Sequence, residues 1–269
     1  MEHRVDRTVP ALSEVSAAVH DRLSFLASVL LLALATVAWV SVVVSSLRGE
    51  DMMMTMAMPL AVADGLAFTL SWTVMMTAMM LPSALPMIVL YGAIQRGAVG
   101  AGTQGVPAAV FTLVYLVVWG ATGVPVYVAH TLLMRLAGLP FSYGVAVILL
   151  AAGVFQLSPL KQVCLRACRS PLGFLLGHWR AGRRGSVRLG WSHALYCLGC
   201  CWALMLVLIA AGAMGLPWVL LITAVVAGEK LLPGGEWVAR AAGGALVLLG
   251  LTVALRPDLV TVLRGGHAM

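Results

Sequence analysis

The first pattern with chemical potential is a group of methionines inside a long apolar stretch. At about 100° per residue, the four fall on one face of a predicted helix: Met75, Met76, Met79 and Met80. Pro82 and Pro86 follow, and a missing backbone donor kinks a helix and gives neighbouring side chains room around an ion. Thioethers bind soft metal ions, but methionine is also a flexible apolar filler. Ligand and packing roles both stay open.

The cysteines give a more specific signal. A second predicted helix carries soft donors within a stripe about 100° wide: His193, Cys197, Cys200 and Cys201, with Met205 beside them. Upstream, Cys164 and Cys168 form an i,i+4 pair among basic residues, which favour thiolate and metal binding. The alternative for this pair is an amphipathic helix on the membrane surface with incidental cysteines. Sulfur ligands without a carboxylate cage predict copper, as Cu(I).

Three further groups contain candidate ligands or charges. Glu229 and Lys230 lie at membrane depth, where they either tune a metal site or pair with each other. His130 and Met134 form an i,i+4 pair that would contribute to an outer site. A methionine group in a predicted outer loop either captures Cu(I) in an oxidising compartment or dips into lipid: Met52, Met53, Met54, Met56 and Met58.

The composition is that of a membrane protein. Hydrophobic residues make up 61% of the chain and charged residues 10%, and the mean hydropathy is +1.00. We therefore predict an all-α fold, a polytopic integral membrane helical bundle with about seven transmembrane helices. The predicted spans are residues 25–46, 66–94, 107–134, 143–160, 189–213, 217–231 and 237–255.

The distribution of basic residues predicts the orientation. If the N-terminus is cytoplasmic, 13 of the 17 Lys and Arg residues face the cytoplasm, as loops rich in these residues do. This predicts a multi-pass protein of the inner membrane with its C-terminus outside. The expected organisation is a cytoplasmic segment 1–24, a metal-binding membrane domain 25–255 with a basic cytoplasmic loop 161–188, and a tail 256–269. The topology accounts for the net charge of +7, so no nucleic acid is expected as a partner.

Several motifs together resemble a bacterial domain-of-unknown-function family of predicted metal-binding integral membrane proteins. The resemblance covers about residues 64–255. The motifs are Trp72-x-x-Met75-Met76-x-Ala78-Met79-Met80-x-Pro82, the stretch from Gln156 through Cys164 and Cys168 to Pro171, Gly199-Cys200-Cys201-Trp202-Ala203-Leu204-Met205, and Glu229-Lys230. The resemblance implies a metal at the matching Met, Cys and Glu positions, which adds Glu229 to the candidate ligands. Copper itself is inferred from the softness of the ligands.

The sequence contains no P-loop, no His-Glu-x-x-His and no Gly-x-Ser-x-Gly motif, so neither an ATP-driven pump nor a classical hydrolase is expected. We predict a membrane protein that binds Cu(I) for transport or for metallochaperone-type handling. The alternative is a metal-bearing or structural accessory subunit of a membrane oxidoreductase complex. The expected partners are the lipid bilayer and a copper chaperone or membrane oxidoreductase subunits.

The predicted orientation is tested by cysteine-accessibility labelling on a background without native cysteines. A cysteine replacing Arg180 is expected to react only from the cytoplasmic side, because the basic residues of the loop 161–188 favour that side. A cysteine replacing Met54 is expected to react only from the outside. The reverse labelling pattern would contradict both the orientation and the order of the proposed metal path.

Overall fold

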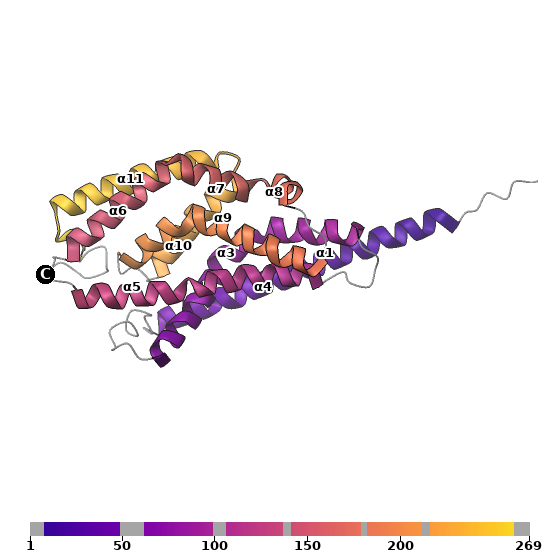
Figure 1. Cartoon of the computed structure of the whole chain (residues 1–269), viewed down its shortest axis with the longest axis horizontal. Coiled ribbons are helices and arrows are strands. Elements are labelled where there is room, and N and C mark those ends of the chain that lie inside the picture. The colour runs from indigo at the N-terminus through magenta and orange to yellow at the C-terminus, as the bar shows by residue number, and fades with distance from the viewer. Residues whose placement is uncertain are drawn as a thin grey trace, which may run out of the picture.

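The computed structural model describes residues 8–48, 62–98, 106–136, 141–178, 182–210 and 216–260, and every regular element in these ranges is a helix (Figure 1). The predicted all-helical class is confirmed. The helices are α1 (Thr8–Leu47), α3 (Val62–Ala98), α4 (Val106–Ala121), α5 (Gly123–Leu136), α6 (Phe141–Leu157), α7 (Pro159–Arg169), α8 (Pro171–His178), α9 (Gly182–Ala210), α10 (Leu216–Leu231) and α11 (Gly235–Leu255). The methionines at 52–58 lie outside the described residues, as do the side chains of His130 and Met134.

Five helices in the described ranges are long and apolar enough to cross a membrane: Phe25–Leu47, Val62–Gln95, Ala108–Ala129, Gly182–Ile209 and Gly235–Leu255. A sixth span results if Ser142–Leu157 and Pro159–Arg169, which meet at 62°, cross as one broken segment. The predicted span 217–231 is helix α10, but its 16 residues are fewer than a full crossing needs. In the described ranges, five or at most six segments thus meet the length and composition of a membrane span, and the count of seven stays a prediction.

The break between α6 and α7 is encoded locally. Pro159 lacks the backbone N–H that would continue α6, and it occupies the first turn of α7, where that donor is not needed. Ser158 caps the new helix, its hydroxyl accepting a hydrogen bond from the Lys161 backbone N–H at 3.2 Å. The expected loop 161–188 is consequently mostly helical, because α7, α8 and the start of α9 occupy it. Its placement on the cytoplasmic side stays a prediction.

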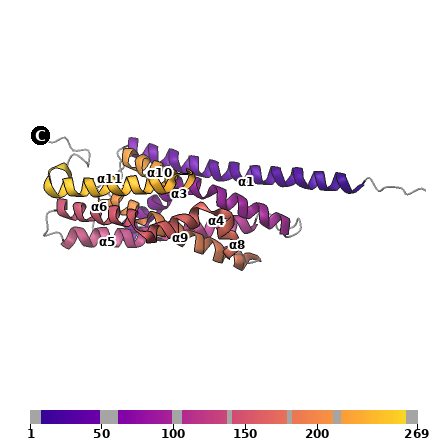
Figure 2. The same cartoon turned by 90° about the horizontal axis from the view of Figure 1, so that it is seen from above.

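The helices form one elongated bundle. Helices α6 and α11 run side by side in both views (Figures 1 and 2), and they make the most extensive contact between any two helices. Helix α3 packs mainly on α1 and α4, whereas α9 packs mainly on α4, α6 and α7. Helix α4 therefore lies between the methionine-bearing helix α3 and the cysteine-bearing helix α9.

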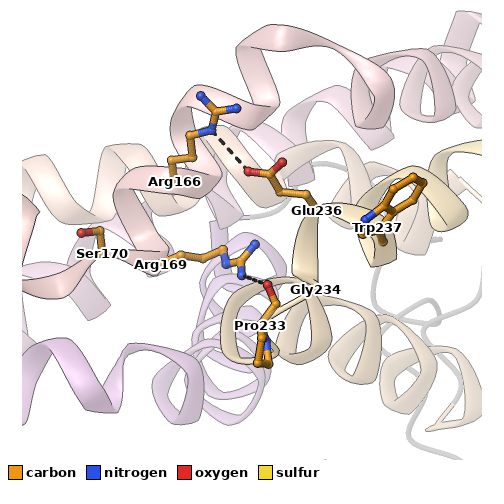
Figure 3. A pocket seen from close by; sticks show the side chains of 7 residues that line it. All are labelled: Arg166, Arg169, Ser170, Pro233, Gly234, Glu236 and Trp237. Atoms are coloured by element: carbon orange, nitrogen blue, oxygen red, sulfur yellow. Dashed lines mark hydrogen bonds and ion pairs between the residues drawn. The ribbon is translucent and has the colours of Figure 1, made fainter.

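Two helix breaks meet at one level of the bundle. Figure 3 shows an open pocket where the end of α7 faces the turn between α10 and α11. Arg169 Nη2 donates to the backbone oxygens of Leu232 and Pro233 at 2.8 and 2.7 Å, and Arg166 Nε pairs with Glu236 Oε1 at 3.3 Å. These contacts hold the end of α7 against the turn that follows α10. They therefore help to position Cys168 of α7 relative to Glu229 and Lys230 of α10.

Close approach of α6 and α11 depends on glycines. A Cβ added at Gly153 would lie 2.7 Å from Val247 Cγ2 and 2.9 Å from the Gly243 carbonyl oxygen, too close for any side chain. Small residues let helix backbones approach closely in membrane-type bundles. Gly144, on the same helix, has no atom within 4 Å of the equivalent position.

We expect Gly153→Ala to lower the free energy of unfolding of the detergent-purified protein by about 1–3 kcal/mol, and with it the melting temperature. The added methyl group would force α6 and α11 apart. Gly144→Ala is the matched control. It should leave stability unchanged or raise it by up to about 1 kcal/mol, since alanine favours helix and meets open space. Equal melting temperatures for the two variants would contradict the described α6–α11 contact.

Candidate metal centre

Four thiols from two helices converge in the interior of the bundle. On α9, Cys197, Cys200 and Cys201 are all buried, with at most 1% of each exposed. Cys200 Sγ lies 3.3 Å from Cys201 Sγ and 3.9 Å from Cys168 Sγ of α7. Cys197 also interacts with these three thiols. The kinked course of α7 thus brings Cys168 to the cysteine stripe of α9, and all five cysteines are free.

A cation and a phenol adjoin this thiol cluster. Lys230 Nζ of α10 lies 3.0 Å from Cys197 Sγ, and the hydroxyl of Tyr115 on α4 lies 3.1 Å from the same sulfur. Lys230 Nζ also reaches Ser83 Oγ at 3.3 Å and Met80 Sδ at 3.9 Å, both on α3. An ammonium this close to sulfur stabilises thiolate over thiol. The site therefore combines thiol, thioether, hydroxyl and ammonium groups contributed by five helices.

The predicted methionine stripe lies in the core. Met75, Met76, Met79 and Met80 are each at most 3% exposed, and Thr77, Ala78 and Leu81 are buried as well, so α3 is covered around its whole circumference at this level. Helix α3 continues through both Pro82 and Pro86. One contact between the methionine stripe and the thiols runs through Lys230, whose Nζ lies 3.9 Å from Met80 Sδ and 3.0 Å from Cys197 Sγ. Met80 is thus a methionine that the structure links to the cysteines.

The remaining candidates on α7 and α9 take different positions. His193 is buried in an aromatic cage, its ring centroid 5.4–5.7 Å from those of Phe111, Tyr115 and Phe174. Its Nδ1 has no hydrogen-bond partner among the described residues. Cys164 is half-buried and packs against α9, where a Cβ at Gly199 would lie 2.9 Å from its sulfur. Met205 is buried further along α9.

Glu229 belongs to a separate buried network. Its Oε2 pairs with Lys161 Nζ at 2.6 Å, and its Oε1 accepts a hydrogen bond from Gln156 Nε2 at 2.6 Å. Lys161 Nζ also donates to Gln156 Oε1. Glu229, Lys161 and Gln156 are fully buried, and of the two roles left open for Glu229 and Lys230, pairing with each other is not found. Adjacent residues on a helix point about 100° apart, and here they serve two different networks.

Sequence reasoning missed several of these residues. Lys161 was counted as a cytoplasmic loop charge, although it lies two residues after Pro159, in the first turn of a helix. Tyr115 carried no spacing signal, and Gln156 entered only as the first residue of a motif of the resembled family. Ser83 carried no signal either, because its contact with Lys230 depends on the packing of α3 against α10.

The donor set suits a soft monovalent ion better than a closed zinc site. Within the described ranges, no three side chains of His, Cys, Asp and Glu are arranged to hold a metal ion. Structural zinc sites use four such ligands in a tetrahedron. Soft thiolate and thioether ligands select Cu(I). Cys200 offers such a sulfur within 4 Å of those of Cys168 and Cys201.

A family model described as PpoB2, copper chaperone, matches residues 69–253. This range runs from α3 to α11 and covers more than half of the chain. The chain belongs to the copper chaperone family. No curated protein and no solved structure shows a significant match. The match includes every helix that contributes a sulfur to the cluster, and it supports an association with copper, as expected from the softness of the ligands.

The buried network around Glu229 generates a stability prediction. Glu229→Leu is expected to destabilise the protein by about 3–5 kcal/mol, because it leaves the Lys161 ammonium buried without its counter-charge. Adding Lys161→Met should recover much of the loss. Chemical unfolding in detergent measures both effects.

The exposed pair of Arg166 and Glu236 supplies the control. Its side chains are 69% and 33% exposed, so Glu236→Gln should cost less than about 1 kcal/mol. If the Glu229 and Glu236 variants lost equal stability, or if adding Lys161→Met deepened the loss, the buried pairing would be contradicted.

Proposed function

We propose that this protein is a multi-pass inner-membrane copper chaperone that holds Cu(I) in the thiol cluster and passes it on by ligand exchange. The observation that carries the proposal is the convergence of Cys168, Cys197, Cys200 and Cys201 in the bundle interior of a copper chaperone family member. Ser, Asp and Glu ligands would favour harder ions, whereas sulfur favours Cu(I).

The surface of the bundle supports membrane insertion. Large apolar side chains are exposed along α1, including Phe25 at 69%, Leu30 at 70% and Leu47 at 78%. A patch of this extent is unfavourable in water but matches lipid. Lys161 and Lys230 are buried and no longer count as loop charges, yet the remaining basic residues still favour a cytoplasmic N-terminus and an outer C-terminus.

Charge balance favours a site with mixed ligands. Cu(I) held by thioethers alone keeps its positive charge, one thiolate neutralises it, and two thiolates make the site anionic. The thiols of α9 therefore supply strong binding, whereas the neutral methionines of α3 supply weaker ligands for loading or release. Lys161 and Gln156 already occupy the two carboxylate oxygens of Glu229, so we assign Glu229 to the support of α10 rather than to the ion.

Chaperone-type handling implies a partner that gives or takes copper. A soluble copper carrier or a copper-dependent membrane oxidoreductase has the required chemistry. An accessory structural role without copper binding is not favoured, because packing alone does not require two thiols in contact and a lysine beside a third thiol within an apolar core.

We expect the double variant Cys200→Ser, Cys201→Ser to retain no copper after purification under reducing conditions, because it removes the two thiols at the centre of the cluster. Elemental analysis of detergent-purified protein measures the copper content. Cys164→Ser is the matched control and should keep most of the copper, since Cys164 packs on the backbone at Gly199. A folded double variant with wild-type copper would show that the proposed site is wrong.

The double variant Met76→Leu, Met79→Leu tests the methionine stripe in the same preparation. It should retain part of the copper but load or release it more slowly, because leucine keeps the apolar volume and removes the thioether. Met87→Leu, a buried methionine outside the stripe on α3, is the control. Normal loading and normal flux in the stripe variant would show that Met76 and Met79 only pack.

A further inference from the structure

A buried ammonium group lies among the proposed copper ligands. Lys230 is 8% exposed, and its Nζ is 3.0 Å from Cys197 Sγ and 3.9 Å from Met80 Sδ. It also interacts electrostatically with Cys200 and Cys201. A positive charge is thus built into the place where a thiol of α9 and a thioether of α3 converge.

The neighbouring carboxylate does not balance this charge. Glu229 directs its two oxygens to Gln156 and Lys161, and the Lys161 ammonium balances the Glu229 carboxylate. Among the described residues, Lys230 also has the Ser83 hydroxyl and the Tyr115 phenol as neighbours, which carry no charge when protonated. The counter-charge for Lys230 therefore comes from the thiol cluster together with whatever ion the cluster holds.

We propose that Lys230 sets the charge selectivity of the site, favouring monovalent soft ions such as Cu(I) over divalent ions such as Zn(II). This inference rests on the proposed copper site. Coulomb energy scales with the product of the charges, so the ammonium repels a divalent ion twice as strongly as a monovalent ion at the same position. In a buried site this difference is poorly screened by salt.

The charge count leads to the same result. Two thiolates and Cu(I) carry one net negative charge, which Lys230 neutralises. Two thiolates and Zn(II) are already neutral, so Lys230 then adds an uncompensated positive charge that burial penalises. If one or three thiolates bind, the absolute charges change, but the excess repulsion of the divalent ion by Lys230 remains. The selectivity effect thus does not depend on which cysteines are ligands.

The test is a competition between Cu(I) and Zn(II) for the full-length protein in detergent, under anaerobic reducing conditions, with the bound ratio read by elemental analysis. Lys230→Leu removes the charge and introduces no ligand atom. Its bound copper-to-zinc ratio is expected to fall about tenfold or more relative to wild type. Removing the ammonium lowers the electrostatic repulsion of Zn(II) more than that of Cu(I). Lys230→Arg retains the charge and should keep a ratio close to wild type.

Two further variants separate charge from packing. Lys230→Gln is a second neutral substitution and should lower the ratio like leucine does. Glu236→Gln removes a charge from the exposed pair of Arg166 and Glu236, away from the thiol cluster, so its ratio should stay near that of wild type. A purely structural role of Lys230 would reduce the binding of both metals together and leave their ratio unchanged.

The outcomes distinguish this inference from the proposed function. Wild-type protein that binds no copper overturns the copper site itself. Wild-type protein that prefers copper, with folded Lys230→Leu or Lys230→Gln at the wild-type ratio, overturns only the selectivity role of Lys230. If neither neutral variant folds, wild-type protein is challenged with Ag(I) and Cd(II), two soft ions that differ by one charge. Preference for Ag(I) is expected, and equal or stronger uptake of Cd(II) overturns the inference.

Discussion

The buried ion pair between Lys161 and Glu229 is the interaction on which the arrangement of the site depends. Two charges that are 0% exposed are costly to remove from water, and they persist only with close and well-directed partners. Gln156 supplies these additional hydrogen bonds, joining the end of α6, the start of α7 and the end of α10. The junction of α6 and α7 is thereby held to the end of α10, 68 to 73 residues later in the chain.

This junction explains how a short helix contributes to the thiol cluster. Pro159 and Ser158 start α7 in a new direction, and Arg169 anchors its far end to the turn after α10. Between these two anchors, Cys168 comes to lie 3.9 Å from Cys200. A helix of 11 residues is marginal by itself, so its position is determined by these contacts rather than by helix propensity.

The same junction separates the roles of Glu229 and Lys230. Because Glu229 is occupied by Lys161 and Gln156, Lys230 is directed to the opposite side, toward Cys197, Tyr115 and α3. An ordinary carboxylate partner for Lys230 would cancel its charge and leave the thiol cluster without an electrostatic bias. Instead, the cluster combines polarisable sulfur with a positive charge, the combination on which the proposed Cu(I) site rests.

The sequence alone determined the helical class and the cysteine stripe of α9, because hydropathy and the helical repeat are local properties. It also pointed to copper through ligand softness, in agreement with the copper chaperone family. Only the tertiary structure decided that Lys161 is buried, that Glu229 and Lys230 do not pair, and that Cys168 joins α9. These facts depend on contacts between helices 32 to 73 residues apart in sequence, which periodicity within one helix does not encode.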